Sequence, residues 1–223
     1  MTTTPIADQV ADLQKNVTGQ LPPEVVEVLS AEQTELDAAG VPSGIAEPGT
    51  PMPDAPLLDV RGRSVTLEQV RQGRPAVVVF YRGAWCPYCN LALRTYQREL
   101  ADELDARGVV MIAVSPQKPD GSLTVVEANE LTYTVLSDPG NGIGQALGIV
   151  TRSDDPVRHA QASLGVDLAE VNADGTHDIV MPTVAIVDAG GTLRWIDVHP
   201  NYTTRTEPTE ILAALTDLSE TTR

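Results

Sequence analysis

Basic residues, cysteines and long apolar runs are all scarce in this chain of 223 residues. Only Lys15 and Lys118 are lysines, and 15 basic residues against 31 acidic ones leave a formal net charge of −16. Binding to phosphate groups needs clustered cations, so this charge argues against nucleic acids and anionic membranes as partners. No stretch approaches the ~18–20 apolar residues of a membrane span, and residues 1–20 lack the pattern of a signal peptide. We therefore expect a cytoplasmic protein.

The two cysteines, Cys86 and Cys89, form a single Cys-x-x-Cys pair. In a cytoplasmic protein such a pair is more often catalytic or metal-binding than a structural crosslink. A zinc site usually needs four ligands, and the scattered histidines His159, His177 and His199 do not supply them. A disulfide that closes a two-residue loop adds little stability. Two inert buried thiols remain an alternative, but the pattern favours redox chemistry without a metal or bound cofactor.

The pattern of apolar residues divides the chain into a helical extension and a larger domain. Weak helical periodicity covers Ile6–Asn16 and Glu24–Ala39, and a segment rich in proline and glycine follows. We therefore predict an N-terminal extension at 1–45, which packs on a neighbour or on a partner subunit, and a domain at 46–220.

Strands and helices alternate in the larger domain, which predicts an α/β fold with a central mixed β-sheet flanked by helices. A hairpin spans residues 57–67, Thr66 caps a short helix that runs to Gln72, and a turn at Asp188–Gly191 joins the last two strands. The predicted strands are Ala76–Tyr81, Val109–Val114, Thr134–Leu136, Val184–Val187 and Thr192–Val198. The predicted helices are Pro87–Arg107, Leu123–Leu131, Ile143–Leu147, Val157–Ser163 and Glu207–Leu218.

The cysteine pair lies where a buried strand ends and a helix begins. Pro87 suits the first helical position, which places Cys86 at the helix N-terminus, where the helix dipole favours a thiolate. Cys89 lies one turn further on, within reach of Cys86. Helix electrostatics thus predict Cys86 as the exposed nucleophile and Cys89 as the shielded resolving cysteine. Pro182 begins a later strand, where a proline can hold a cis bond and leave its neighbour's backbone free for a substrate chain.

These features together resemble the peroxiredoxin-like (AhpC/TSA) branch of the thioredoxin superfamily. The resemblance covers about residues 57–218 and implies a thioredoxin-like fold and a thiol-dependent peroxidase or a related disulfide oxidoreductase. It rests on Val77-Val78-Val79-Phe80-Tyr81-Arg82-Gly83-Ala84-Trp85-Cys86-Pro87-Tyr88-Cys89-Asn90, Ala113-Val114-Ser115-Pro116-Gln117, Val135-Leu136-Ser137-Asp138 and Ile186-Val187-Asp188 with Gly190-Gly191.

The chain departs from the peroxiredoxin pattern Pro-x-x-x-Thr/Ser-x-x-Cys. When the pattern is aligned with this chain, Arg82 stands in place of the proline, Cys86 in place of the hydroxyl residue, and Cys89 is the cysteine that attacks the peroxide. This alignment reverses the roles that helix electrostatics predict for the two cysteines. Peroxiredoxins also carry an arginine near the later strand, where this chain has Met181-Pro182-Thr183. Pro182 matches the cis-proline of thioredoxins instead, and Arg82 could replace the missing cation.

The sequence therefore predicts a thiol-dependent peroxidase that reduces hydrogen peroxide or organic hydroperoxides, with thioredoxin or a similar dithiol as reductant. Cys86 and Cys89 are the expected catalytic residues, and Arg82, Trp85 and Pro182 are expected to contact substrate. The assembly could be a homodimer. Two alternatives stay open: a thioredoxin-like protein disulfide oxidoreductase, and a non-enzymatic redox sensor or binding module that uses the N-terminal helices.

Overall fold

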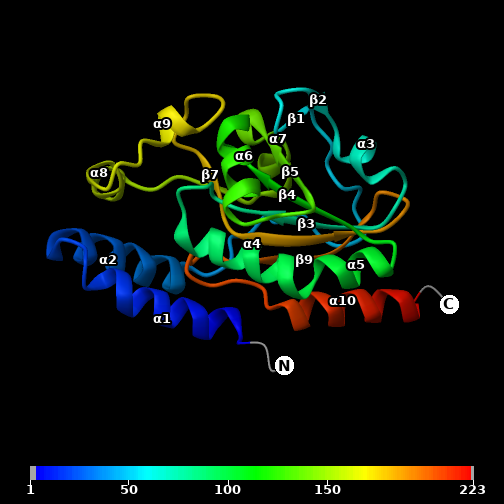
Figure 1. Ribbon diagram of the computed structural model, residues 1–223, viewed down its shortest axis with the longest axis horizontal. Helices are drawn as coiled ribbons and strands as arrows, with labels where there is room; N and C mark the ends of the chain where they lie inside the picture. The colour runs from blue at the N-terminus through cyan, green and yellow to red at the C-terminus, as the bar shows by residue number, and fades with distance from the viewer. Residues whose placement is uncertain (1–3, 222–223) are drawn as a thin grey trace.

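A mixed β-sheet of seven strands forms the centre of the computed structural model, which describes residues 4–221 (Figure 1). The strand order is β2-β1-β5-β4-β3-β8-β9. The central strand β3 pairs in parallel with β4 and antiparallel with β8, so the predicted mixed direction is confirmed. The bounds of the strands are β1 Leu57–Asp59, β2 Ser64–Val65, β3 Ala76–Phe80, β4 Val110–Ser115, β5 Thr134–Ser137, β8 Thr183–Val187 and β9 Leu193–Val198.

Helices cover both faces of the sheet, because the central strands are apolar on both sides. All five residues of β3 are buried. Val77 and Val79 pack in a cluster with residues of α1, α4 and α10, whereas Val78 and Phe80 pack in a second cluster with α3 and α7. No helix within residues 4–221 is long and apolar enough to cross a membrane. The helices of the domain around the sheet include α3 Leu67–Arg71, α4 Pro87–Glu99, α5 Ala101–Ala106, α6 Pro119–Ala128, α7 Gly142–Leu147 and α10 Pro208–Thr221, with a 3₁₀ turn at Pro139–Asn141.

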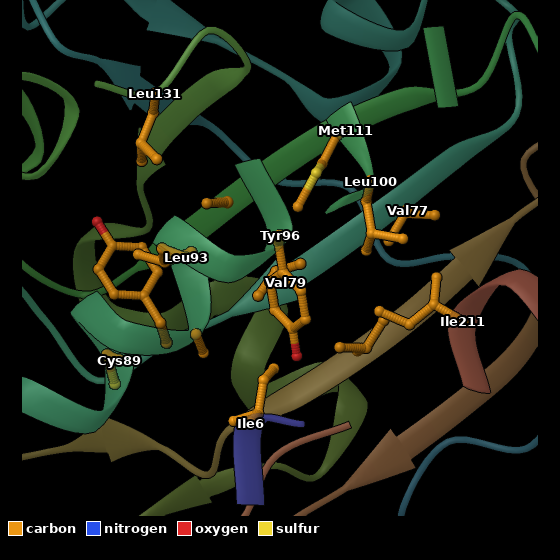
Figure 2. Packing of buried hydrophobic residues seen from close by; sticks show 14 of the residues in the cluster. Ile6, Val77, Val79, Cys89, Leu93, Tyr96, Leu100, Met111, Leu131 and Ile211 are labelled. Atoms are coloured by element: carbon orange, nitrogen blue, oxygen red, sulfur yellow. The ribbon is translucent and has the colours of Figure 1, made fainter. Parts of the chain in front are cut away.

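The N-terminal helices α1 (Ile6–Thr18) and α2 (Pro23–Ala39) both pack on the body of the same chain. Ile6 is buried in the cluster beside α4 (Figure 2). The carboxylate of Glu207 accepts hydrogen bonds from the backbone N–H groups of Ile6 and Ala7, both at 2.9 Å, and so satisfies the first turn of α1. The helix α2 lies against α8 (Asp155–Ser163) (Figure 1). A domain boundary at residue 45 stays a prediction.

The structure differs from the predicted elements mainly between residues 99 and 180. The predicted helix Pro87–Arg107 is interrupted at Leu100, whose φ of −117° is far from the helical value. The polar stretch after residue 150 holds α9 (Leu168–Val171) and a two-stranded sheet of β6 (Val150–Thr151) and β7 (Ile179–Val180). These elements of two to four residues are too short to show periodicity in a sequence.

Candidate active site

The cysteine pair sits at the junction between β3 and α4, as the sequence predicts. Cys86 is the N-cap residue of α4, Pro87 is its first residue and Cys89 lies in its first turn. The carbonyl oxygen of Cys86 accepts hydrogen bonds from the backbone N–H groups of Cys89 and Asn90, both at 3.1 Å. Both cysteines therefore lie at the N-terminus of α4, where the positive end of the helix dipole favours a thiolate.

Both sulfurs are buried, so the expectation of an exposed Cys86 is wrong. Cys86 and Cys89 are free thiols and each is 1% exposed. Cys89 lies at the edge of the core near Leu93 and Tyr96 (Figure 2). The first turn of α4 directs it inward because α4 packs its apolar face against the sheet. Burial alone disfavours a thiolate, so a thiolate at this position needs a nearby positive charge.

That charge comes from Arg205, which sequence reasoning missed. Its Nη2 atom donates to the Sγ of Cys89 at 3.1 Å and lies 4.0 Å from the Sγ of Cys86. Its Nη1 atom donates to the carbonyl oxygens of Tyr202 at 2.6 Å and Thr204 at 2.5 Å, which fix the guanidinium. The signal that could have found it is the arginine that the resemblance implies near a later strand; the sequence directs attention to residues 181–183, whereas Arg205 follows β9.

The two thiols have opposite pKa shifts. Burial would raise the pKa of Cys89, but the hydrogen bond from Cys86 and the charge of Arg205 outweigh burial and lower that pKa to about 5. Burial raises the pKa of Cys86, and the neighbouring Cys89 thiolate raises it further. The pair therefore holds one thiolate, at Cys89, and one thiol, at Cys86, near neutral pH.

A network of hydrogen bonds holds the loop that leads to Cys86. The buried side chain of Gln117 accepts from the backbone N–H of Ala84 at 2.6 Å and donates to the hydroxyl of Tyr81 at 3.0 Å. The side chain of Asn90 donates to the carbonyl oxygen of Ala84 at 2.7 Å. Both backbone groups of Ala84 are thus paired, which fixes the loop beside the thiols.

Gly83 is required in this loop, and its replacement by alanine is expected to destabilise the protein. Its φ is +152°, and a Cβ atom would lie 2.4 Å from the Nε1 of Trp85. The strained backbone and the clash should lower the free energy of unfolding of Gly83→Ala by about 1–3 kcal/mol, measured by urea denaturation. Gly19→Ala is the matched control, since nothing lies within 4 Å of its added Cβ. Equal stability of the two variants would contradict this account.

Arg82 and Trp85 lie against each other close to the thiols. The guanidinium carbon of Arg82 lies 4.7 Å from the centroid of the Trp85 ring and 4.0 Å from that of Tyr202, so the arginine stacks on both rings. The ring of Tyr88 lies 6.3 Å from that of Tyr202 and completes the aromatic wall. Arg82 is 4% exposed, and its charge contributes to lowering the pKa of Cys89.

Pro182 has a different environment from the one that the sequence predicts. The Met181–Pro182 bond is trans, so the expected cis bond is wrong. The backbone on either side is already paired: the N–H of Met181 donates to the carbonyl of Ile149, and the carbonyl of Pro182 accepts from the N–H of His199, each at 2.8 Å. This strand start therefore leaves no such backbone group free for a substrate chain.

A small cavity of about 10 Å³ touches Cys89. That volume holds about one water molecule. His199 lines it, and the imidazole is held between the carboxylate of Asp197 at 2.9 Å and the hydroxyl of Thr204 at 2.8 Å. This pairing joins β9 to the loop that carries Arg205. Residues that line the cavity include Cys89, Pro182, Thr183, His199, Arg205 and Thr206.

Comparisons with known proteins agree on one family. The AhpC/TSA family matches residues 48–196. Thioredoxin-like protein AAED1 of Arabidopsis thaliana is 30% identical over 124 residues, 56% of this chain and 48% of that protein. Peroxiredoxin Bcp of Escherichia coli is 31% identical over 97 residues, 44% of this chain and 61% of that protein. The chain thus spans about half to two thirds of the length of these curated relatives.

Solved structures support the fold. The crystal structure of reduced Prx3 from Vibrio vulnificus in complex with hydrogen peroxide superposes with a TM-score of 0.60 at 22% sequence identity. The match covers 77% of this chain and 99% of that one. With the mixed sheet and its flanking helices, this likeness confirms the predicted thioredoxin-like fold with N-terminal helices added to it.

Proposed function

Because the chain belongs to the AhpC/TSA family, we propose that it is a thiol-dependent peroxidase that reduces hydroperoxides through a cycle of Cys89 and Cys86. One observation carries the proposal: the buried Cys89 thiolate lies 3.1 Å from the guanidinium of Arg205 and beside a water-sized cavity. A thiolate is the form of cysteine that attacks a peroxide bond, and a fixed guanidinium can stabilise the charge that develops on the peroxide oxygens.

We assign the first attack to Cys89 and the resolving role to Cys86, the reverse of the expectation from helix electrostatics. The low pKa of Cys89 supports this order, because Cys86 keeps its proton at the pH where Cys89 has lost its own. In this chain Cys86 occupies the position where peroxiredoxins carry a hydroxyl. Its thiol hydrogen-bonds Cys89 as a hydroxyl would, and it is also able to form a disulfide.

The cycle has three steps that balance in atoms and electrons. The Cys89 thiolate attacks the terminal oxygen of a hydroperoxide, the O–O bond breaks, and the alkoxide or hydroxide that leaves takes a proton. Cys89 is then a sulfenic acid, oxidised by two electrons. The thiol of Cys86 condenses with it, and water leaves as the Cys86–Cys89 disulfide forms. An external thiol reductant returns two electrons and restores the pair.

The size of the cavity beside Cys89 favours small oxidants. About 10 Å³ leaves room for a molecule the size of water, so hydrogen peroxide fits with less movement of neighbouring side chains than a bulky organic hydroperoxide. Thioredoxin or a similar dithiol is the electron donor in this proposal. We place the reaction in the cytoplasm, where such reductants keep cysteines in the thiol form.

Peroxide oxidation of the reduced wild-type protein tests the proposed function. We expect both thiols to disappear together, one pair per hydrogen peroxide, at least about 100-fold faster than free cysteine reacts at neutral pH. Thiol counting by time-resolved alkylation and mass spectrometry measures both rate and product. The same protein unfolded in urea is the control, since unfolding separates Cys89 from Arg205. Oxidation of the folded protein no faster than that of free cysteine would overturn the proposal.

A further inference from the structure

The loop between β9 and α10 spans residues 199–207 and places Arg205 beside the thiols. The buried side chain of Asn201 shapes the turn within this loop. Its Oδ1 atom accepts hydrogen bonds from the backbone N–H of Thr203 at 3.0 Å and from the hydroxyl of the same residue at 2.8 Å. Its carbonyl oxygen accepts from the backbone N–H of Thr204 at 3.0 Å, and the carbonyl of Thr204 in turn accepts from the guanidinium. The conformation of Asn201 thus determines where one anchor of Arg205 lies.

The amide group of Asn201 is held from outside the loop, by the helix α2. Its Nδ2 atom donates to both carboxylate oxygens of Asp37, each at 2.9 Å, although the two residues are 164 positions apart in the chain. An amide whose oxygen accepts inside the loop and whose nitrogen donates to a carboxylate has one favourable orientation. A hydrogen bond to a charged acceptor is also stronger than one between neutral groups. Asp37 therefore keeps Asn201 in the orientation that the turn requires.

A second residue of α2 contacts the same loop. Gln33 lies one turn before Asp37 on the same face of the helix, and its Nε2 atom donates to the hydroxyl of Tyr202 at 3.3 Å. The side chain of Tyr202 is buried, and its carbonyl oxygen accepts from the guanidinium of Arg205 at 2.6 Å. The helix α2 thus contacts two of the loop residues that precede the arginine.

The helix α1 contacts the other end of the loop. Glu207, two positions after Arg205, caps the first turn of α1 through the backbone of Ile6 and Ala7. The chain that leads into α10 therefore passes beside both N-terminal helices (Figure 1). Val25 is the one buried residue of α2, so this helix lies on the surface and adds little to the core. Two of its polar contacts are made instead with the loop that carries the arginine.

We propose that the helix α2 contributes a positioning residue, Asp37, to the active site. Through Asn201, Asp37 keeps the loop in the conformation that brings its guanidinium to the sulfur of Cys89. The inference rests on the proposed function, in which that guanidinium stabilises the attacking thiolate, and it gives the N-terminal helices a role in the reaction. The carboxylate of Asp37 exchanges no proton or electron with the thiols and acts on them through the position of the guanidinium.

The test follows the rate of alkylation of Cys89 by iodoacetamide against pH, in full-length Cys86→Ser protein with and without Asp37→Ala. We expect the rise in rate to move from about pH 5 to a higher pH in Asp37→Ala, because a displaced guanidinium stabilises the thiolate less. At about pH 6 the variant should react roughly three- to tenfold more slowly, and the two rates should converge at high pH. Loss of a carboxylate charge would by itself lower the pKa of the thiol, so a shift to higher pH reports the position of Arg205.

Matched variants separate positioning from charge and from folding. Asp37→Asn removes the same charge as Asp37→Ala but keeps an oxygen that can accept from Asn201, so its profile should lie between those of the parent and Asp37→Ala. Glu35→Ala removes the same charge from an exposed residue of α2 and should leave the profile unchanged. Gln33→Leu should give a smaller shift in the same direction as Asp37→Ala, since its hydrogen bond is longer and uncharged. Asn201→Ala should also shift the profile, and Asp37→Ala should then add nothing further, because Asp37 acts through Asn201.

An unchanged profile in Asp37→Ala, an equal shift in Glu35→Ala, or a further shift in the double variant would overturn the proposal. Single-turnover oxidation by hydrogen peroxide at about pH 6 should slow by the same factor as alkylation. The role of α2 and the peroxidase function fail separately. Fast oxidation of the wild-type protein with an unchanged Asp37→Ala profile contradicts only the role of α2, whereas wild-type oxidation no faster than that of free cysteine contradicts the peroxidase function itself.

Discussion

Replacing Cys89 by serine is expected to abolish the reaction with hydrogen peroxide, whereas replacing Cys86 should leave one fast oxidation and stop turnover. In Cys89→Ser the remaining thiol is Cys86, whose pKa is raised by burial, so it has almost no thiolate at neutral pH. In Cys86→Ser the thiolate stays beside Arg205, and a serine hydroxyl replaces the thiol that hydrogen-bonds it. We expect oxidation rates at least about 1,000-fold apart, since the thiolate is the nucleophile.

Stopped-flow oxidation by one equivalent of peroxide measures the two rates, and trapping with a sulfenic-acid reagent identifies the product. Cys86→Ser should accumulate a sulfenic acid at Cys89, because no resolving thiol is present. The double variant supplies the background rate. If Cys89→Ser keeps the fast phase and Cys86→Ser loses it, the assignment made here is reversed and Cys86 is the attacking residue, as helix electrostatics alone predict.

Arg205→Gln is expected to produce the second largest effect, by raising the pKa of Cys89 above its value of about 5. A lowered pKa means that the thiolate predominates above pH 5, so the wild-type reaction rate rises through that pH and is level at neutrality. Without the guanidinium, burial disfavours the charge and the rise moves to higher pH. At about pH 6 the variant should react roughly one to two orders of magnitude more slowly with a small alkylating agent.

The pH profile separates this electrostatic effect from misfolding. Measured in a Cys86→Ser background, the alkylation rates of Arg205→Gln and of the parent should converge at high pH, where both hold a thiolate. In Arg205→Lys the alkylation rate should rise at a pH between those of the parent and of Arg205→Gln, because lysine restores the charge without the planar guanidinium. Arg61→Gln removes a cation that is exposed and should leave the midpoint unchanged. A profile in Arg205→Gln that still rises near pH 5 would show that the thiolate does not depend on this arginine.

The sequence predicts the sheet and the position of the cysteine pair because these depend on strong local patterns. The run Ala76–Phe80 is β-branched and apolar throughout, and Pro87 marks the first turn of a helix. The hairpin around residues 57–65 and the capping role of Thr66 are likewise local, and both are confirmed. What the sequence does not reveal is how the ends of the strands face one another.

Arg205 illustrates that limit. Its contact with Cys89 joins residues 116 apart in the chain and depends on the loop between β9 and α10 folding back over the start of α4. No periodicity encodes such a contact, and the resemblance directs attention to residues 181–183, which hold no arginine, rather than to residue 205. The burial of Cys86 was missed for a similar reason, since it is surrounded by segments distant from it in sequence.

The distance along the chain between Cys89 and Arg205 also bears on how the protein matures. A growing or partly folded chain that has not yet docked residues 199–206 holds a cysteine with an ordinary pKa of ~8.5, which reacts slowly with oxidants. The hydrogen bond from Arg205 that helps to lower the pKa of Cys89 forms only once the loop after β9 lies against the start of α4. Docking of this loop therefore lowers the pKa of Cys89, because it brings the guanidinium to the sulfur.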